Sequence, residues 1–557
     1  MPWRAAQHNV GLLGGEVQLT LRGGPRAPRA TLDAKPSFLG DPAGPPEPVE
    51  DGRLVWRFPA LAPGRGLVRA TLDGQRLAAR VSVFERRALF LAPVISSNRH
   101  EGWDPLCYLF GGTPEGLALA GHAFPKTRQL RKMYHDRGLP ITWLIDQAVA
   151  AEAGELLTGW HLEHGDGVAA LPSSFIHHNA INLNLAPDDG PAVALLGETV
   201  RGVEEALGCL VRVAGVDQWV GSVGSRFVRA ARGLGLIGLW GLGFDHATCD
   251  TSMFHRGAPW DVYKPDPEEY RRPAREAAEL WAFQWTTRDV LNTVRTPNGG
   301  AGGATLFSTD PDDIRVAGIM RHQPDYWTAL LDDWRRNRPW NDCGVFLIHQ
   351  EDHDCHFPEN ADYLRYFLDA LPPDVTPATL EEIALWLNLV HAPAGHPRVA
   401  LLLEDVLRCR DRVDLLWVEK PADWPGPGER YPAHLAYYDR DRMFFTARPD
   451  RLPVRWFDYR RAARAPEDGV LPEAAVPRVA VEDERWEPAG GGSLRYRATL
   501  TADVDCPNCP WTVWDPPAGG IAAGDRVLAA TPACVAMLLD IAAGRRDYAV
   551  EMGRNPG

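Results

Sequence analysis

The chain has 557 residues, of which 45% are hydrophobic and 24% charged, and its formal net charge is −14. This length exceeds what a single hydrophobic core serves, so two to four domains are expected in a soluble globular protein. No apolar run reaches the roughly 18 residues of a membrane span, and the acidic balance argues against a nucleic-acid partner, whose phosphates need clustered lysine and arginine.

The first residues and the cysteines bear on the cellular compartment. The opening segment MPWRAAQHNVGLLGGEVQL lacks the apolar stretch of a secretory signal. Nine cysteines, an odd number scattered along the chain, are more typical of reduced thiols than of a disulfide framework. The sequence therefore predicts a cytoplasmic protein, or a secreted one if a leader has been removed. It does not indicate the oligomeric state.

Within the first predicted domain, residues 1–86, apolar and polar side chains alternate with a period of two from Gly15 to about Glu85. The segments EVQLTLRGG, RLVWRFPAL, GLVRATLDG and RLAARVSVFE are separated by glycine, proline and aspartate turns. Short alternating strands at this spacing predict a small antiparallel β-sandwich, which we expect to be an accessory domain.

The pattern changes at residue 87. ALFLAPVISS, LPITWLID, GVAALPSS, LIGLWGLGFD and WAFQWTTRDV are typical of buried strands, and helical segments such as AFPKTRQLRKMYHDRG lie between them. GETVRGVEEALGCLVRVAG is also predicted to be helical. Repeated strand–helix units predict parallel strands, and about six or seven such units over residues 87–392 predict a closed or nearly closed barrel that carries the active site.

A junction rich in proline and glycine, HAPAGHP, ends this region. The segments LAYYDRDRMFFTARP, LPVRWFDYR, SLRYRATLTADVD and RVLAATPACVAML then predict a mostly β domain over 393–557, with a loop at 461–490. The fold class is therefore multidomain α/β plus β, with an N-terminal β-sandwich, a central barrel and a C-terminal β domain.

The densest group of reactive side chains is CGVFLIHQEDHDCH, from Cys343 to His356. Its apolar run predicts a buried strand, and His349 and Glu351 would stand at the carboxyl end, where α/β enzymes carry their chemistry. Similar residues follow the other predicted strands: His100, Glu101 and Asp104, then Asp146, then His177 and His178, then Asp245 and His246. Because the carboxyl ends of barrel strands converge on one mouth, we expect these side chains to share a cavity.

These residues suit two kinds of chemistry. In the first, His100, His177 and His178 bind a divalent metal such as Zn²⁺. Asp104 or Asp245 then activates water, Asp146 is a further catalytic candidate, and His349 with Glu351 transfers protons near the leaving group. In the second, no metal is needed, because Asp245 and Glu351 act as the paired carboxylates of a glycoside hydrolase.

Aromatic and polar side chains near these strand ends are candidates for substrate contacts. Flat aromatic faces stack on sugar rings, although filling of the core explains many of the 20 tryptophans equally well. The long charged loop around Asp245 is a suitable substrate wall. The candidates are Trp103, Trp143, Trp240, Arg256, Trp260, Lys264 and Gln350.

Three segments resemble the polysaccharide deacetylases. YHDRGLPITWLID is similar to the point in that family where a helix ends and a strand begins. VFLIHQ is similar to its closing strand, whose final histidine lies by the acetyl group, and ALPSSFIHH falls where the family has two metal-binding histidines. The resemblance implies that residues 87–392 form a distorted (β/α)7 barrel, and it implies metal-dependent deacetylation of a carbohydrate.

The sequence departs from that family at two places. The paired aspartates that the family carries after the first barrel strand are replaced by SSNRHEGWD, and its spaced histidine pair is replaced by the adjacent His177 and His178. Glycoside hydrolases of the α-mannosidase and amylase-like families, with the same barrel and trailing β domains, look similar as well. The sequence thus predicts a hydrolase of a carbohydrate or glycoconjugate, with deacetylation as the first hypothesis. A metal-free glycoside hydrolase and a non-catalytic carbohydrate-binding protein are the alternatives.

Overall fold

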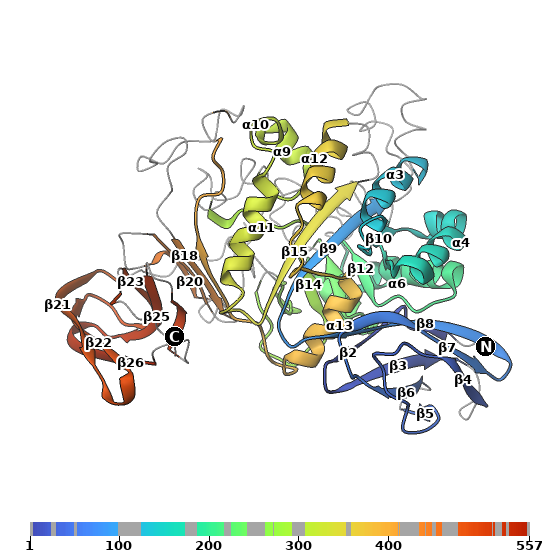
Figure 1. Cartoon of the computed structure of the whole chain (residues 1–557), viewed down its shortest axis with the longest axis horizontal. Helices are drawn as coiled ribbons and strands as arrows, with labels where there is room; N and C mark the ends of the chain where they lie inside the picture. The colour runs from blue at the N-terminus through green and yellow to red at the C-terminus, as the bar shows by residue number, and fades with distance from the viewer. Residues whose placement is uncertain are drawn as a thin grey trace.

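The fold is described from a computed structural model, in which three regions follow one another along the chain (Figure 1). The structure describes residues 4–23, 29–49, 53–97, 124–172, 186–216, 224–241, 262–270, 272–291, 307–351, 358–409, 412, 434–439, 442–447, 453–458, 477–514, 516–517, 526–530 and 534–553.

Two four-stranded sheets form the N-terminal sandwich. One has the order β1 (Arg4–Ala5), β3 (Glu16–Arg22), β6 (Arg53–Pro59), β5 (Glu47–Pro48), and the other β2 (His8–Leu12), β8 (Gln75–Phe84), β7 (Gly64–Leu72), β4 (Ala30–Ala34). Val17, Trp56, Phe58 and Val81 pack in one core between them. The predicted sandwich is confirmed, except that β2, which was not predicted, runs parallel to β8.

Seven parallel strands form the central sheet. Their order is β14 (Trp281–Phe283), β13 (Gly238–Trp240), β12 (Val213–Gly215), β11 (Gly167–Ala170), β10 (Thr142–Ile145), β9 (Ala88–Ser97), β15 (Cys343–Glu351), and β16 (Thr376–Pro377) also pairs with β9. Residues that follow β14 contact β15: the Thr287 backbone amide donates to the carbonyl of Leu347 at 3.1 Å, and the Thr309 hydroxyl donates to the same carbonyl. The predicted distorted barrel is confirmed.

Helices surround this sheet (Figure 1). They are α3 (Phe124–His135), α4 (Gln147–His164), α6 (Gly190–Leu207), α7 (Gly224–Gly233), α9 (Pro311–Val316), α10 (Ile319–His322), α11 (Tyr326–Asn337), α12 (Pro358–Asp369) and α13 (Leu380–Val390). Helix α13 closes the amino end of the barrel, because its Ile383 and Trp386 pack into the interior cluster with Phe90 and Val94. The carboxyl end is therefore the end at which side chains can meet a substrate.

One predicted helix is too long. The apolar periodicity predicted a helix that ran to residue 215, but α6 ends at Leu207 and β12 begins at Val213. Gly208 ends the helix, since its φ of 67° is a left-handed conformation that glycine adopts at little cost.

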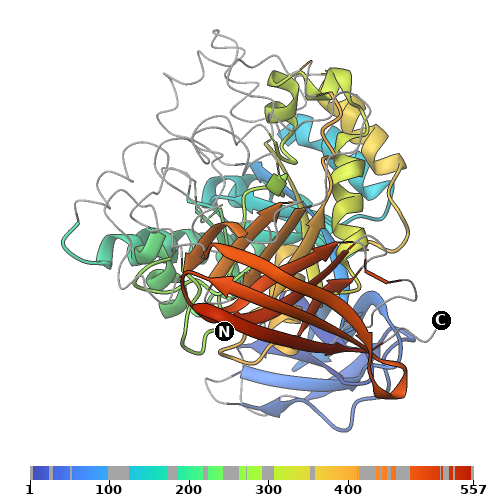
Figure 2. The same cartoon turned by 90° about the vertical axis from the view of Figure 1, so that its left-hand side faces the viewer.

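The C-terminal region consists of antiparallel sheets, which lie nearest the viewer in Figure 2. One contains β17 (Val399–Leu403), β18 (His434–Asp439), β19 (Arg442–Ala447) and β20 (Pro453–Asp458). The second contains β21 (Val479–Pro488), β22 (Leu494–Ala502) and β26 (Gly544–Met552), and the third β23 (Cys506–Trp514), β25 (Cys534–Ile541) and β24 (Val527–Ala530). A loop was wrongly predicted at 479–488, because β21 is an edge strand with mostly exposed, charged side chains.

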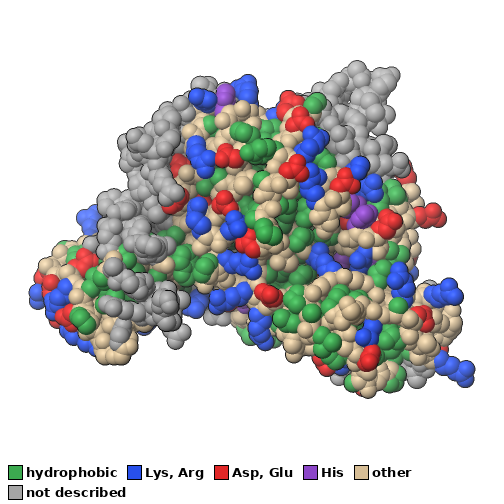
Figure 3. All heavy atoms as spheres, in the orientation of Figure 1, with side chains coloured by type: hydrophobic (Ala, Val, Ile, Leu, Met, Phe, Trp, Pro, Cys, Tyr) green, Lys and Arg blue, Asp and Glu red, His purple; other side chains and the backbone are tan. Residues whose placement is uncertain are grey.

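The structure also bears on surface charge, membrane-spanning helices and disulfides. Acidic and basic side chains are interspersed over the face in Figure 3. Across the described ranges, no helix is long and apolar enough to cross a membrane. Six cysteines fall in those ranges, and no disulfide joins any two of them.

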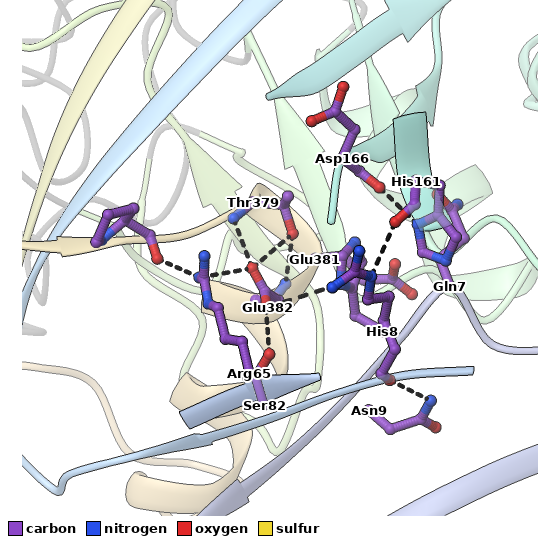
Figure 4. A network of polar contacts seen from close by, with 12 residues as sticks. Gln7, His8, Asn9, Arg65, Ser82, His161, Asp166, Thr379, Glu381 and Glu382 are labelled. Atoms are coloured by element: carbon purple, nitrogen blue, oxygen red, sulfur yellow. Dashed lines mark hydrogen bonds and ion pairs between the residues drawn. The ribbon is translucent and has the colours of Figure 1, made fainter. Parts of the chain in front are cut away.

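A buried polar network, which we call the sandwich–barrel junction, joins the sandwich to the amino end of the barrel (Figure 4). Its centre is Glu382 on α13, which accepts hydrogen bonds from the Ser82 hydroxyl at 2.5 Å and the Arg65 guanidinium at 2.9 Å. Thr379 and Glu382 also form a capping box at the start of α13. Both partners from the sandwich are thus bonded to the helix that closes the barrel.

His8 lies in the same junction as a neutral imidazole. Burial lowers the pKa of His8 to about 3, against the opposing effect of the Glu382 carboxylate 3.7 Å away. Neither ring nitrogen of His8 has a hydrogen-bond partner among the described residues. Arg212 completes the contact by bonding Glu381 at 2.6 Å and the His8 carbonyl at 2.5 Å.

Candidate functional site

The candidate site lies at the carboxyl ends of β9 and β15, around His349. Along β15, Val345 and Leu347 point into the barrel and Phe346 and Ile348 point outward to the helices. His349 follows in the inward register, and its side chain is completely buried. The predicted strand and its terminal histidine are therefore both at the carboxyl end of the barrel.

Two polar side chains flank the imidazole. Its Nε2 lies 3.2 Å from the Ser96 hydroxyl, and its Nδ1 lies 3.6 Å from an Asp310 carboxylate oxygen. Ser96 comes from the end of β9, next to β15 in the sheet, and Asp310 directly precedes α9. Serine, histidine and aspartate thus form a line, with the histidine in the middle.

The position of Asp310 is fixed by its neighbours. Its Oδ1 accepts from the Asp313 amide at 3.4 Å in the first turn of α9, while its own amide donates to the Ser308 hydroxyl at 3.0 Å. The Ser308 hydroxyl in turn donates to the Asp313 carboxylate at 2.8 Å. These bonds leave Oδ2 as the atom closest to His349.

Two tryptophans enclose the imidazole. The ring centroids of Trp240 and Trp285 lie 4.9 Å and 4.3 Å from that of His349. Both indoles pack in the barrel-interior cluster, and Trp240 is fully buried. In this apolar surrounding, hydrogen bonds and charges act with less screening than in water.

The other described candidates have structural contacts. Gln350 points away from the barrel interior, where its Oε1 accepts from the Tyr134 hydroxyl of α3 at 2.5 Å. Asp146 is the N-cap of α4 and accepts from the Val149 amide at 2.7 Å. Gln350 was predicted to contact substrate and Asp146 to be catalytic, but each side chain is hydrogen-bonded to another part of the protein.

Trp143 and Lys264 were predicted to contact substrate, but the structure places both in the protein interior. Trp143 stacks on Trp160 of α4 and donates to Asp166 at 2.8 Å, on the helix side of the sheet. Lys264 is fully buried at the opposite end of the barrel, where its Nζ donates to the carbonyls of Ala392 and Pro393. Burial lowers the pKa of Lys264 to about 8. Sequence order does not show which face of a strand a tryptophan occupies, nor that a lysine folds back to the other barrel end.

Several predicted site residues lie outside the described residues. They are His100, Trp103, Asp104, His177, His178, Asp245, Arg256 and Trp260. Glu351 ends β15, but its side chain is likewise outside the described set. The single cavity that we predicted for all of these side chains remains a prediction.

Three residues of the site were not predicted: Ser96, Asp310 and Trp285. Strand alternation would have identified the first and the last, since each lies two residues after an inward side chain, Val94 and Phe283. Asp310 precedes Pro311, and an aspartate followed by proline is typical of a helix start, which also fixes the carboxylate.

A divalent metal would need at least three ligands at such a site. Within the ranges that the structure describes, no three histidine, cysteine, aspartate or glutamate side chains are placed to hold an ion. His349 and Asp310 supply two groups, and the three predicted ligands lie outside those ranges. The described residues therefore do not by themselves fit a metal.

Comparisons with known proteins give only weak structural similarities. No family model matches the chain, and no curated protein matches it. Proteins assigned as polysaccharide deacetylases in Mycobacterium smegmatis and Pseudomonas aeruginosa PAO1 are each 13% identical, over 54% and 55% of this chain and 89% and 93% of their own, with TM-scores of 0.35 and 0.38. A Bacteroides fragilis protein assigned as an α-galactosidase/melibiase is 11% identical over 99% of this chain and 98% of its own, with a TM-score of 0.24.

These proteins carry the two kinds of assignment, deacetylase and glycosidase, that the sequence resemblance suggested. With all three TM-scores below 0.5, the likeness does not decide the reaction. The reaction is therefore inferred from the residues around His349.

Proposed function

We propose that the chain is a hydrolase of a carbohydrate or glycoconjugate and that it removes acetyl groups, with His349 as the group that transfers protons. The observation that supports this proposal is the environment of His349. The imidazole is buried at the carboxyl end of the barrel, between a hydroxyl and a carboxylate and against two indoles. Such surroundings suit general acid–base catalysis better than they suit a packing role.

The carbohydrate class is supported by the sequence. The segments around Trp143 and His349 are those that resemble polysaccharide deacetylases, and the structure places the strands of both in the parallel barrel sheet. A terminal histidine on the closing strand is the feature that the resemblance associates with the acetyl group. The negative net charge favours a neutral or cationic substrate over a polyanion.

His349 can serve both halves of a hydrolysis. With its Nδ1 toward the Asp310 carboxylate, that nitrogen holds the proton and Nε2 is free to accept one. Nε2 would take a proton from the attacking hydroxyl group and then deliver it to the leaving oxygen or nitrogen. Asp310 would stabilise the positive charge that the ring carries between these two events.

A substrate panel tests the proposed function. The whole chain should release acetate from O-acetylated or N-acetylated oligosaccharides, measured by an enzyme-coupled acetate assay, and should leave aryl glycosides intact. Release of the aryl alcohol without acetate would instead support the paired-carboxylate reaction of Asp245 and Glu351. Binding of oligosaccharides without any product would support a non-catalytic carbohydrate-binding protein.

The predicted metal is tested separately, because no step above depends on it. If His100, His177 and His178 bind Zn²⁺ or a related ion, purified protein should contain about one equivalent by elemental analysis. That content should fall in a protein with both His177→Ala and His178→Ala. Metal-free protein that remains active would rule the metal out of the reaction.

A further inference from the structure

We propose that Ser96 is the nucleophile of this hydrolase, so that the acetyl group passes through an ester on the Ser96 hydroxyl. This inference rests on the proposed function and names the attacking atom in the same site. It concerns a residue to which the sequence analysis assigned no role. It depends on three observations about the arrangement of Ser96, His349, Asp310 and Trp285.

The first observation is the order of the polar groups. A serine hydroxyl becomes a nucleophile when an adjacent base accepts its proton and a third group orients that base. The Ser96 hydroxyl lies 3.2 Å from Nε2 of His349, and the opposite ring nitrogen lies 3.6 Å from Asp310. The second distance is longer than a hydrogen bond, but catalytic contacts often shorten only when substrate binds.

The second observation is the direction and exposure of Ser96. Val94 points into the barrel and Ile95 points to the helices, so the alternation of β9 turns Ser96 inward, on the side of His349. Ser96 is 8% exposed, whereas His349 is 0% exposed. The hydroxyl is therefore nearer to the solvent than its base, as an attacking atom must be.

The third observation is an unsatisfied donor beside the imidazole. Trp285 packs edge-on against His349, and its buried indole Nε1 has no acceptor among the described residues. Buried donors in folded proteins are normally hydrogen-bonded, so an unpaired one needs an explanation. An acyl oxygen bound next to His349 could accept from this group, which would stabilise negative charge on that oxygen.

The proposed reaction needs no co-reactant other than water. As the Ser96 oxygen bonds to the acyl carbon, its proton moves to His349 Nε2 and the carbonyl electron pair moves to the acyl oxygen. The pair returns, the bond from the acyl carbon to the sugar oxygen or nitrogen breaks, and the imidazole proton goes to that leaving atom. Water then gives a proton to His349, adds to the acyl carbon and displaces the Ser96 oxygen, which regains the proton as acetate leaves.

A covalent probe tests the inference without a known substrate. The whole wild-type chain is incubated with a fluorophosphonate, which reacts with activated serine hydroxyls, and the adduct is located by peptide mass spectrometry. We expect one adduct per chain, on Ser96, which is absent from Ser96→Ala and much reduced in Asp310→Asn. Ser225→Ala, on the outer face of α7, is the matched serine control and should label like wild type.

The outcomes separate this inference from the function on which it rests. Ser96→Ala should lower acetate release at least 100-fold, and Ser96→Cys should recover a thiol that reacts with iodoacetamide. If wild type takes up no probe and Ser96→Ala keeps its acetate release, water attacks directly, and the nucleophile is overturned while the hydrolase stands. If Ser96 is labelled but no acetylated sugar is cleaved, the nucleophile stands and the proposed substrate is overturned.

Discussion

Replacing His349 by glutamine should lower kcat/KM for acetate release by about 10²- to 10⁴-fold, the usual range for the loss of a general acid–base group. The glutamine amide can take the place of Nε2 beside Ser96, but it cannot accept and return a proton. The loss should appear in kcat, because the proton is transferred during the chemical step. Steady-state kinetics on the best acetylated substrate from the panel measure both parameters.

The control must show that the barrel has stayed intact around this buried position. Circular dichroism and the thermal midpoint of the variant should resemble those of wild type. His164→Asn is the matched histidine control, because His164 is half-buried at the end of α4, away from the barrel mouth. A folded His349→Gln protein with more than a tenth of wild-type activity would remove His349 from the mechanism.

Replacing Glu382 by glutamine should destabilise the attachment of the sandwich by about 3 kcal/mol, because removal of one member of a buried ion pair leaves its partner uncompensated. Arg65 would lose its carboxylate, and Ser82 would lose its acceptor. Hydrogen exchange at the β8 amides of Val81 and Val83 reports the free energy of opening this sheet. Their protection should fall in the variant at pH 7.

The dependence on pH gives a second, independent readout. Burial raises the pKa of Glu382, but the Arg65 guanidinium and the hydrogen bonds from Ser82 and Thr379 together hold it below the ordinary value. A carboxylate with a lowered pKa stabilises the folded state at pH values above its unfolded pKa and loses this contribution as the pH falls. The difference between wild type and Glu382→Gln should therefore shrink below about pH 4.5. Glu551→Gln, in an exposed pair with Arg495, should change little at either pH.

Unchanged protection of Val81 and Val83 at pH 7 would show that the sandwich is held by apolar packing instead. Comparison with Glu551→Gln separates the loss of the buried Glu382 charge from the effect of removing any one negative charge. Since the candidate site is at the other end of the barrel, acetate release by folded Glu382→Gln protein should stay near that of wild type.

The sequence was sufficient to predict the order of the three regions, because alternation and strand–helix repetition are local patterns. It also placed His349 correctly at a strand end, since an apolar run followed directly by polar residues marks where a buried strand emerges. Short strands were harder to predict. Residues 213–215 continue an apolar segment, and only the left-handed Gly208 shows that the helix has already ended.

The candidate site was predicted only in part, for a geometric reason. The sequence showed which polar residues follow strands, but not which of them face the barrel interior. Ser96 is the first polar residue at the end of an otherwise apolar strand, and the sequence does not show that it faces the barrel interior; Asp310 reaches His349 from a separate helix start. For Lys264 the prediction was wrong. This charged residue was expected to contact substrate, but it donates to backbone carbonyls at the amino end of the barrel.

The threonine hydroxyl contacts that join β15 to the segment after β14 have a consequence for how this fold could diversify. Elsewhere around the cylinder neighbouring strands share backbone ladders, which tolerate almost any side chain. Between Thr287 and Leu347 the wall depends on the threonine hydroxyls as well as on the main chain. Substitution of Thr287 or Thr309 could therefore widen the cylinder at one seam close to the reactive histidine, so that bulkier substrates could be admitted without a new fold.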